Sequence, residues 1–270
     1  MSAEAATAAT PYSARRFVLA TDLDGTFLGG SEADRRALYD WIEARREEVG
    51  LIFVTGRDPG FLERLCGDGR VPWPDFVVGD VGTTIAEIAF EGRRGRVRPI
   101  PALEKEIAER WGDSAGAVRR ALDGAPGLAL QPTAFRHRVS YDYDPDRFDA
   151  AALGAIERLG LDWLISDDRF LDVLPKGVSK GPSLKRLLRW LGAPGERVLA
   201  AGDTMNDLSM LESGLPAVAV GGSERPLLAR LAHAPAVHRA DAIGAGGILE
   251  AIAAHGLHPD APSPTPPEQE

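Results

Sequence analysis

The 270-residue sequence lacks several features that mark particular protein classes. Its single cysteine, Cys66, cannot form an intramolecular disulfide, which favours a reducing compartment. No uninterrupted apolar run approaches the roughly 20 residues that cross a bilayer, and the N-terminal segment has no apolar signal core. A net charge of −9 argues against a broad nucleic-acid surface. We therefore expect a cytoplasmic protein that binds neither membrane nor nucleic acid, as a monomer or a small homo-oligomer.

Lysine is also scarce, because only four of the 31 basic residues are lysines. Three of them, Lys176, Lys180 and Lys185, fall within ten residues. Lys185 fits the surface of a helix. A compact ammonium differs chemically from the arginine guanidinium that this chain otherwise prefers. The 176–185 window is therefore a candidate for lysine-specific chemistry.

Apolar runs alternate with helical patterns along much of the chain. The predicted buried strands are residues 16–22, 50–56, 75–79, 197–203 and 216–221. Ser31 and Asp58 are expected to cap the helices that follow the first two strands. Continuous apolar strands separated by helices indicate a parallel sheet with both faces covered. The sequence predicts a doubly wound, mostly parallel α/β core of the Rossmann-like kind.

The middle of the chain has a different pattern. Residues 101–124 and 146–160 read as helices, 134–143 alternate, and 161–174 are strand-like. We expect a smaller α/β cap at residues 88–175, inserted into a core formed by residues 14–87 and 176–256. Residues 1–13 and 257–270 have too little apolar content to pack and are expected to be flexible tails.

The segment DLDGT, residues 22–26, begins at the last residue of the first predicted strand. Residues two apart on an extended chain point the same way, so Asp22 and Asp24 can face one pocket. Such a pair can divide phosphoryl chemistry, with one carboxylate attacking phosphorus and the other moving the leaving-group proton. The alternatives are a helix-capping turn and a calcium loop. Calcium-loop spacing, however, places Phe27 and Ala33 where glycine and glutamate belong.

Two further segments can hold phosphate. Thr55 and Gly56 end the second strand, where a hydroxyl and free backbone amides can meet phosphate oxygens. Lys180 lies at the start of a helix, where the dipole disfavours its charge and a shared anion would relieve the conflict. The alternatives are an ordinary turn at Thr55 and a solvated lysine in a loop. Lys176, four residues earlier, is a rival for the same role.

The segment GDTMND, residues 202–207, follows the fourth strand. Asp203, Asn206 and Asp207 can converge there, and such hard oxygen ligands suit Mg²⁺. The alternative is a cluster of helix caps, since both residue types favour such positions. All four segments are expected at the carboxyl edge of one sheet, where open α/β folds bind ligands.

In this order, D-x-D-G-T, T-G-R, the G-V-S-K-G lysine and G-D-x-x-N-D resemble the motifs of the haloacid dehalogenase superfamily of phosphohydrolases. The resemblance covers residues 16 to about 250. A cap placed after the second motif is similar to the C2B-cap (Cof-type, IIB) branch. Within that branch, residues 79–85 and 138–141 are similar to segments of sucrose-phosphate phosphatases and related sugar-phosphate phosphatases.

The resemblance implies a role for each motif residue. Asp22 would be the nucleophile and Asp24 the general acid and base. The residues that hold phosphate would be Thr55, Gly56 and Lys180. The Mg²⁺ site would be formed by Asp22, Asp24 through its carbonyl, Asp203, Asn206 and Asp207. Mg²⁺ and Lys180 would together neutralise the charge that opposes attack on a phosphate dianion.

The expected function is a Mg²⁺-dependent phosphatase that hydrolyses a small sugar or disaccharide phosphate through an aspartyl-phosphate intermediate. Three alternatives remain. One is a phosphomutase of the same superfamily, similar to phosphomannomutases. A nucleotide-binding module would need a G-x-G-x-x-G after the first strand, but the glycine-rich residues 244–247 lie near the chain end. A non-catalytic metal-binding scaffold would not need both Asp22 and Asp24.

The cap is expected to select the substrate through residues 135–143, which read FRHRVSYDY. Period-two alternation would place Phe135, Val139 and Tyr141 on one face and Arg138 and Ser140 on the other. Because arginine and serine suit sugar hydroxyls, Arg138 and Ser140 are the candidate sugar contacts. The alternative is a solvated face of an ordinary cap sheet.

Overall fold

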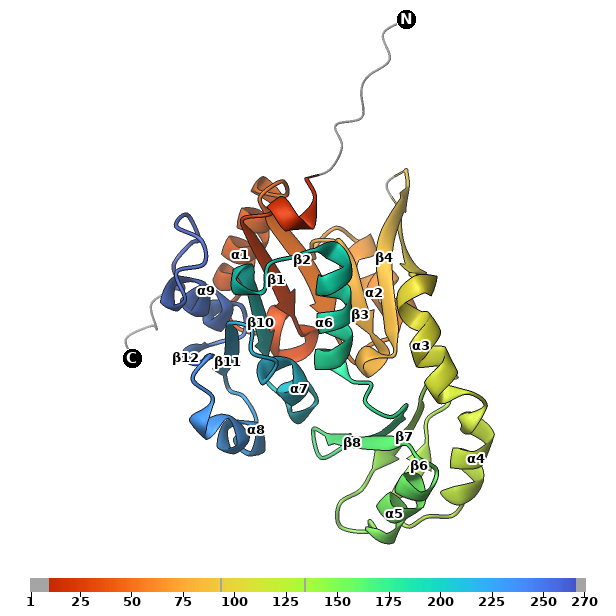
Figure 1. Cartoon of the computed structure of the whole chain (residues 1–270). Coiled ribbons are helices and arrows are strands. Elements are labelled where there is room, and N and C mark those ends of the chain that lie inside the picture. The colour runs from red at the N-terminus through yellow and green to blue at the C-terminus, as the bar shows by residue number, and fades with distance from the viewer. Residues whose placement is uncertain (1–9, 93, 134, 266–270) are drawn as a thin grey trace, which may run out of the picture.

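The computed structural model describes residues 10–92, 94–133 and 135–265 around one large sheet (Figure 1). Its strand order is β12-β11-β10-β1-β2-β3-β4-β5. The strands are β1 Phe17–Thr21, β2 Val49–Val54, β3 Phe76–Gly79, β4 Thr84–Glu91, β5 Arg94–Pro99, β10 Val198–Gly202, β11 Ala217–Gly221 and β12 Val237–Ile243. β1 lies in the middle of the sheet, parallel to its neighbours β2 and β10.

The predicted parallel sheet is confirmed. Each of the five expected strands corresponds to an observed one, namely β1, β2, β3, β10 and β11, and these pair in parallel. All residues of β1, β2 and β10 are buried. Strands that are buried on both faces have no polar side to alternate with, which explains their continuous apolar runs.

Helices cover both faces of the large sheet (Figure 1). One face packs against α1 Glu32–Ala44, α2 Pro59–Gly67 and α9 Ala245–Ala254, and the other against α6 Lys180–Leu191, α7 Leu208–Leu211 and α8 Arg225–Arg230. The expected caps are present, since Ser31 accepts from the Asp34 amide and Asp58 from the Phe61 amide. No helix among the described residues has the length and apolar character to span a membrane. The core is therefore doubly wound, as predicted.

A second, antiparallel sheet forms the inserted unit, in the order β6-β7-β9-β8. Its elements are α4 Ser114–Ala121, β6 Leu128–Leu130, β7 Val139–Tyr143, α5 Ala151–Arg158, β8 Asp162–Ser166 and β9 Phe170–Leu174. Val118 of α4 and Ile156 of α5 pack with Tyr141 and Leu171 of the sheet in a separate hydrophobic cluster. This unit, called the cap below, has a core of its own.

Residues 88–99 were expected in the cap, but they belong to the large sheet. β4 pairs antiparallel with β3, and β5 extends the edge as a hairpin. The outer part of this hairpin is exposed and charged, so its pattern differs from the buried strands and resembles a new unit. α3, Pro101–Trp111, then leads to the cap, with Ile107 in the core of the large sheet and Trp111 in that of the cap.

Parts of both expected tails contact the core. Tyr12 is buried, and its hydroxyl donates to Asp75 Oδ2 at 2.7 Å. At the other end, His258 is buried and its ring meets Trp41 edge-on. Each segment thus has one buried aromatic side chain, and Leu257 and Ala261 also pack against the core. The low apolar content of these segments conceals such contacts. Residues 1–9 and 266–270 lie outside the described residues.

Candidate active site

Four sequence motifs meet at the carboxyl edge of the large sheet. Asp22 follows β1, Thr55 follows β2 and Asp203 follows β10, while Lys180 begins α6. Since β2, β1 and β10 are parallel neighbours, their ends bring these side chains together. A cavity of about 560 Å³ lies at this edge between core and cap, and its walls include Asp22, Asp24, Gly56, Asp203 and Asn206. The predicted convergence is therefore what the fold produces.

Lys180 lies beneath Asp22 and has no exposed surface. Its Nζ donates to Asp22 Oδ1 and to Asp207 Oδ1, each at 2.6 Å. A buried charge is tolerated only when it is paired and hydrogen-bonded, because desolvation of a single ion costs several kcal/mol. The rival Lys176 is exposed and pairs with Asp162 outside this cavity. Lys180, not Lys176, is therefore the lysine of the site.

Electrostatics at this edge favour an additional cation. Burial opposes the charged form of Lys180, yet Asp207 and Asp22 hold its pKa above the ordinary lysine value. Burial raises the pKa of Asp22; Lys180 opposes this rise, and the nearby carboxylates add to it. Burial, followed by the charge of Asp207, also raises the pKa of Asp203 to about 7. Three carboxylates around one ammonium are thus incompletely neutralised.

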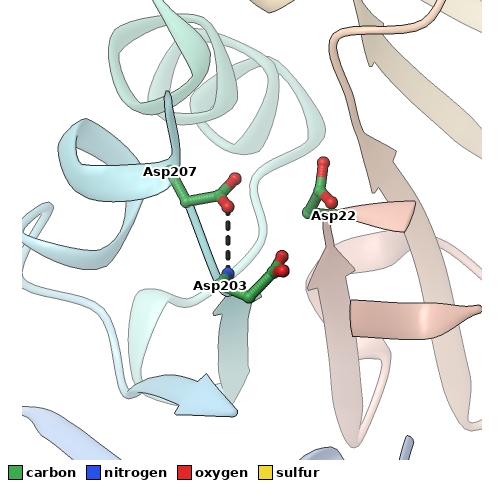
Figure 2. Close-up of side chains that lie close together, drawn as sticks. All are labelled: Asp22, Asp203 and Asp207. Atoms are coloured by element: carbon green, nitrogen blue, oxygen red, sulfur yellow. Dashed lines mark hydrogen bonds between the residues drawn. The ribbon is translucent and has the colours of Figure 1, made fainter. Parts of the chain in front are cut away.

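The donor set fits a hard divalent cation. One oxygen from each of Asp22, Asp203 and Asp207 lies within 4.8 Å of the others, and Figure 2 shows the three carboxylates gathered in one place. Thr26 Oγ1 donates to Asp203 Oδ1 at 2.8 Å and so orients that side chain. Asn206 Oδ1 is buried without a hydrogen-bond partner among the described residues. An unpaired buried oxygen beside two carboxylates on a cavity wall is a suitable ligand.

Asp207 differs from the other predicted metal ligands. It is fully buried and is absent from the cavity wall. Its Oδ1 accepts from Lys180. Its Oδ2 accepts from the backbone amides of Asp203 and Thr204, each at 3.0 Å, and Figure 2 shows the bond from the Asp203 amide. With both oxygens occupied, Asp207 holds the 202–207 loop in shape and aims Asp203 into the cavity.

Asp24 reaches the cavity wall but pairs with an arginine there. Arg57 Nε and Nη2 donate to its two carboxylate oxygens at 2.8 and 2.9 Å, and the guanidinium lies over the Phe61 ring. The Asp24 side chain is 53% exposed and the Arg57 side chain is 49% exposed. Exposed ion pairs contribute only about 0–1 kcal/mol, so this pair can separate at little cost.

The predicted phosphate-holding residues at the end of β2 differ in their distance from the cavity. Gly56 forms part of the cavity wall, whereas Thr55 is buried behind it. The Thr55 hydroxyl accepts from the Arg57 amide at 3.1 Å, and its backbone amide donates to Val78 of the neighbouring strand. Thr55 thus shapes the turn that presents Gly56 to the cavity.

Arg138 lies on the cavity wall and also ties the cap to the core. Nη1 donates to Asp172 Oδ1 of β9 at 2.8 Å, and Nη2 donates to the Gly56 carbonyl at 2.9 Å. Nη2 also lies 3.7 Å from Asp80 Oδ1 of the core. The Arg138 side chain is only 6% exposed. Its guanidinium is therefore largely committed to protein groups on both sides.

Ser140 does not reach the cavity. It is buried, and its hydroxyl donates to Asp172 Oδ1 within the cap sheet. The alternation assumed for residues 135–143 holds only inside β7, which begins at Val139. Before that residue the chain is irregular, so Phe135 and Arg138 come to the same side and the guanidinium stacks on the ring, 3.6 Å from its centroid. Period-two reasoning fails where the backbone is not extended.

Sequence reasoning missed several residues of the cavity wall. The cap contributes Gln131, Thr133, Phe135, Arg169, Phe170 and Asp172, and the core contributes Arg57. One signal was available for Asp172, which is the single charged residue in the apolar run FLDVL. Phe170 begins β9, and the others lie in turns and loops, where side-chain directions do not follow a simple period.

We predict that Mg²⁺ stabilises the folded protein, because an ion that binds only the folded state raises the free energy of unfolding. At about 100 times its Kd the gain is about 2.7 kcal/mol, or roughly 5–10 °C in Tm for a chain of this size. Asp203→Asn should lose most of the shift, whereas Asp68→Asn, an exposed carboxylate outside the site, should keep it. Thermal unfolding with and without Mg²⁺ measures this. A wild-type Tm that is the same with and without Mg²⁺ would contradict a cation site.

Comparison with known proteins places this site in a family. A glucosylglycerol-phosphate synthase from Pseudomonas anguilliseptica is 42% identical over 244 residues, 89% of this chain and 31% of the synthase. A mannosylfructose-phosphate phosphatase from Agrobacterium fabrum is 30% identical over 253 residues, 90% of this chain and 98% of that protein. Sucrose-phosphatase 1 of Nicotiana tabacum is 28% identical over 267 residues, 92% of this chain. The chain thus spans about a third of the synthase and 61% of the tobacco protein.

Solved structures agree with the sequence relatives. The sucrose-phosphatase of Synechocystis, determined with sucrose and phosphate, has a TM-score of 0.79 and 25% identity, covering 90% of this chain and 98% of its own. A haloacid dehalogenase-like hydrolase of Bacillus subtilis shares the fold, with a TM-score of 0.60 and 19% identity over 89% of this chain and 92% of its own. The profile of the sucrose-6F-phosphate phosphohydrolase family matches residues 15–256. Because this match spans nearly the whole described chain, the protein belongs to the sucrose-6F-phosphate phosphohydrolase family.

Proposed function

We propose that this chain is a Mg²⁺-dependent phosphatase that hydrolyses a small phosphorylated glycoside through an aspartyl-phosphate on Asp22. The observation that carries the proposal is the position of Asp22, whose Oδ1 accepts from the buried Lys180 at 2.6 Å. Its Oδ2 accepts no hydrogen bond from the described residues, and the side chain lines the cavity. One oxygen is thus anchored while the other is free to attack phosphorus.

The proposed reaction has two steps that use the same pair of aspartates. Asp22 Oδ2 attacks phosphorus and the P–O bond to the sugar breaks, while Asp24 gives its proton to the departing sugar oxygen. Asp24 then takes a proton from water, which attacks the phosphorus of the aspartyl-phosphate and releases phosphate and Asp22. Because Arg57 Nε and Nη2 bind both carboxylate oxygens of Asp24, their pair has to separate before Asp24 can reach the leaving oxygen.

Asp22, Asp203, Asn206 and the Asp24 carbonyl are the proposed Mg²⁺ ligands, with Asp207 holding their loop. When bound, Mg²⁺ supplies charge neutralisation for the phosphate. Lys180 adds a second positive charge beneath Asp22, at a buried position where electrostatic interactions are stronger than in water. Thr55 and Gly56 shape the turn that faces the phosphate oxygens.

The proposed substrate class is a sugar joined by a glycosidic bond to a phosphorylated sugar or polyol. The names of the three sequence relatives share this chemistry: glucosylglycerol phosphate, mannosylfructose phosphate and sucrose phosphate. A cavity of about 560 Å³ lies within the roughly 300–1,000 Å³ typical of small-molecule sites. Gln131, Thr133 and Arg169 of the cap supply polar groups on its wall.

Release of inorganic phosphate from a panel of esters tests the proposal. The panel holds glucosylglycerol phosphate, mannosylfructose phosphate, sucrose 6F-phosphate and p-nitrophenyl phosphate, each with and without Mg²⁺. We expect Mg²⁺-dependent release from at least one glycoside phosphate. Asp22→Asn should abolish it, because the amide is nearly isosteric but poorly nucleophilic, while Asp68→Asn should leave it unchanged. Isomerisation that is activated by a sugar bisphosphate, without phosphate release, would instead identify a phosphomutase.

Arg138→Ala tests whether the cap arginine acts on the sugar alone. Because its guanidinium binds the Gly56 carbonyl beside the phosphate, we expect kcat/KM to fall by about 10-fold or more for both a glycoside phosphate and p-nitrophenyl phosphate, the size of a lost charge-assisted hydrogen bond. Arg169 is a cap arginine on the cavity wall, so Arg169→Ala should lower kcat/KM more for the glycoside phosphate than for p-nitrophenyl phosphate. If Arg138→Ala hydrolysed p-nitrophenyl phosphate at the wild-type rate, Arg138 would act only in recognising the sugar.

A further inference from the structure

A carboxylate outside the motifs joins the cap to the loop that carries the proposed metal ligands. Glu224 lies three residues after β11, at the start of α8. Its Oε1 accepts from the Asp167 amide of the cap at 3.1 Å, and its Oε2 accepts from the Met205 amide of the core at 2.6 Å. One side chain therefore bridges backbone groups of two units that the chain builds separately.

On the cap side, Glu224 meets the tip of the β8–β9 hairpin. Asp167 and Asp168 have φ values of 54° and 45°, and the Arg169 amide donates to the Ser166 carbonyl at 3.1 Å. Two consecutive positive φ values inside such a bond form a type I′ turn, which matches the twist of the strands. The turn does not use the Asp167 amide for its own closing bond, so this amide is available to Glu224. Because Ser166, Asp167 and Arg169 line the cavity, the tip forms part of its wall.

On the core side, Glu224 contacts the 202–207 loop twice. Its backbone amide donates to the Asp203 carbonyl at 2.9 Å, and its side chain binds the amide of Met205, next to Asn206. The strand β8 also packs beside this loop. Glu224 thus connects the hairpin tip directly to the loop whose residues are proposed to hold Mg²⁺. Glu224 itself is not part of the cavity wall.

We infer that Glu224 is a positioning residue that fixes the cap hairpin on the metal-binding loop, and so sets the distance between the sugar-binding wall and Asp22. This inference rests on the proposed function. A substrate that contacts both cap and core needs that distance, whereas a small aryl phosphate that contacts only the core does not. Glu224 therefore contributes to specificity without touching the reacting atoms.

The test compares Glu224→Ala and Glu224→Gln with wild type. Glu224→Ala removes both bonds, so the KM for glucosylglycerol phosphate should rise by about 10-fold or more, with kcat/KM for p-nitrophenyl phosphate changed less than about threefold. Glu224→Gln keeps one acceptor oxygen and should give an intermediate KM. Glu212→Ala removes an exposed carboxylate beyond this bridge as a matched control and should behave as wild type.

Hydrogen exchange provides a readout that does not need activity. Peptides covering residues 166–170 and 204–206 should exchange faster in Glu224→Ala than in wild type or Glu212→Ala, because both amides lose their acceptor. The inference would be overturned if Glu224→Ala lowered kcat/KM equally for both substrates, or if hydrogen exchange at the hairpin tip were unchanged in that variant. If no ester on the panel is hydrolysed, the proposed function fails, while the exchange data still decide whether Glu224 holds the hairpin.

Discussion

The buried ammonium of Lys180 is the interaction on which the site depends. It has no exposed surface and lies 2.6 Å from both Asp22 and Asp207. A charge in that position must be paired, because a lone buried ion would cost several kcal/mol. The ends of β1 and β10 and the start of α6 therefore have to meet within a side-chain length. That requirement draws three distant parts of the sequence into one place and leaves Asp22 with a free oxygen on the cavity wall.

Close packing around these charges also explains the glycines of the motifs. A Cβ at Gly25, whose φ is 77°, would lie 2.2 Å from Asp203 Oδ2. A Cβ at Gly202 would lie 2.5 Å from the Asp207 side chain. Contacts this short are not tolerated, so both positions need glycine for space, and Gly25 also for its backbone angle. The same glycines let the side chains of Asp203 and Asp207 pack directly against the backbone of the motifs.

The sequence predicts the core well because its signals are local. Buried parallel strands appear as apolar runs, and the caps at Ser31 and Asp58 depend on neighbouring residues. The edge hairpin β4–β5 and the bridge made by Glu224 depend on partners far away in the chain, which no local pattern reports. Ser140 shows a third limit, since its side chain points to Asp172 inside the cap and not to the cavity. The motif residues could thus be found from the sequence. Which of them line the cavity, and which hold its walls in place, could be learned only from the structure.

Phosphorylation of Asp22 is the step on which the proposed reaction depends. Rapid mixing of the protein with Mg²⁺ and its fastest panel substrate, followed by an acid quench and peptide mass spectrometry, measures this directly. We expect one added phosphoryl group on the peptide that contains Asp22, appearing before or with the first released phosphate and absent in Asp22→Asn. A full turnover of phosphate with no phosphorylated peptide, or a phosphoryl group on another residue, would contradict Asp22 as the nucleophile.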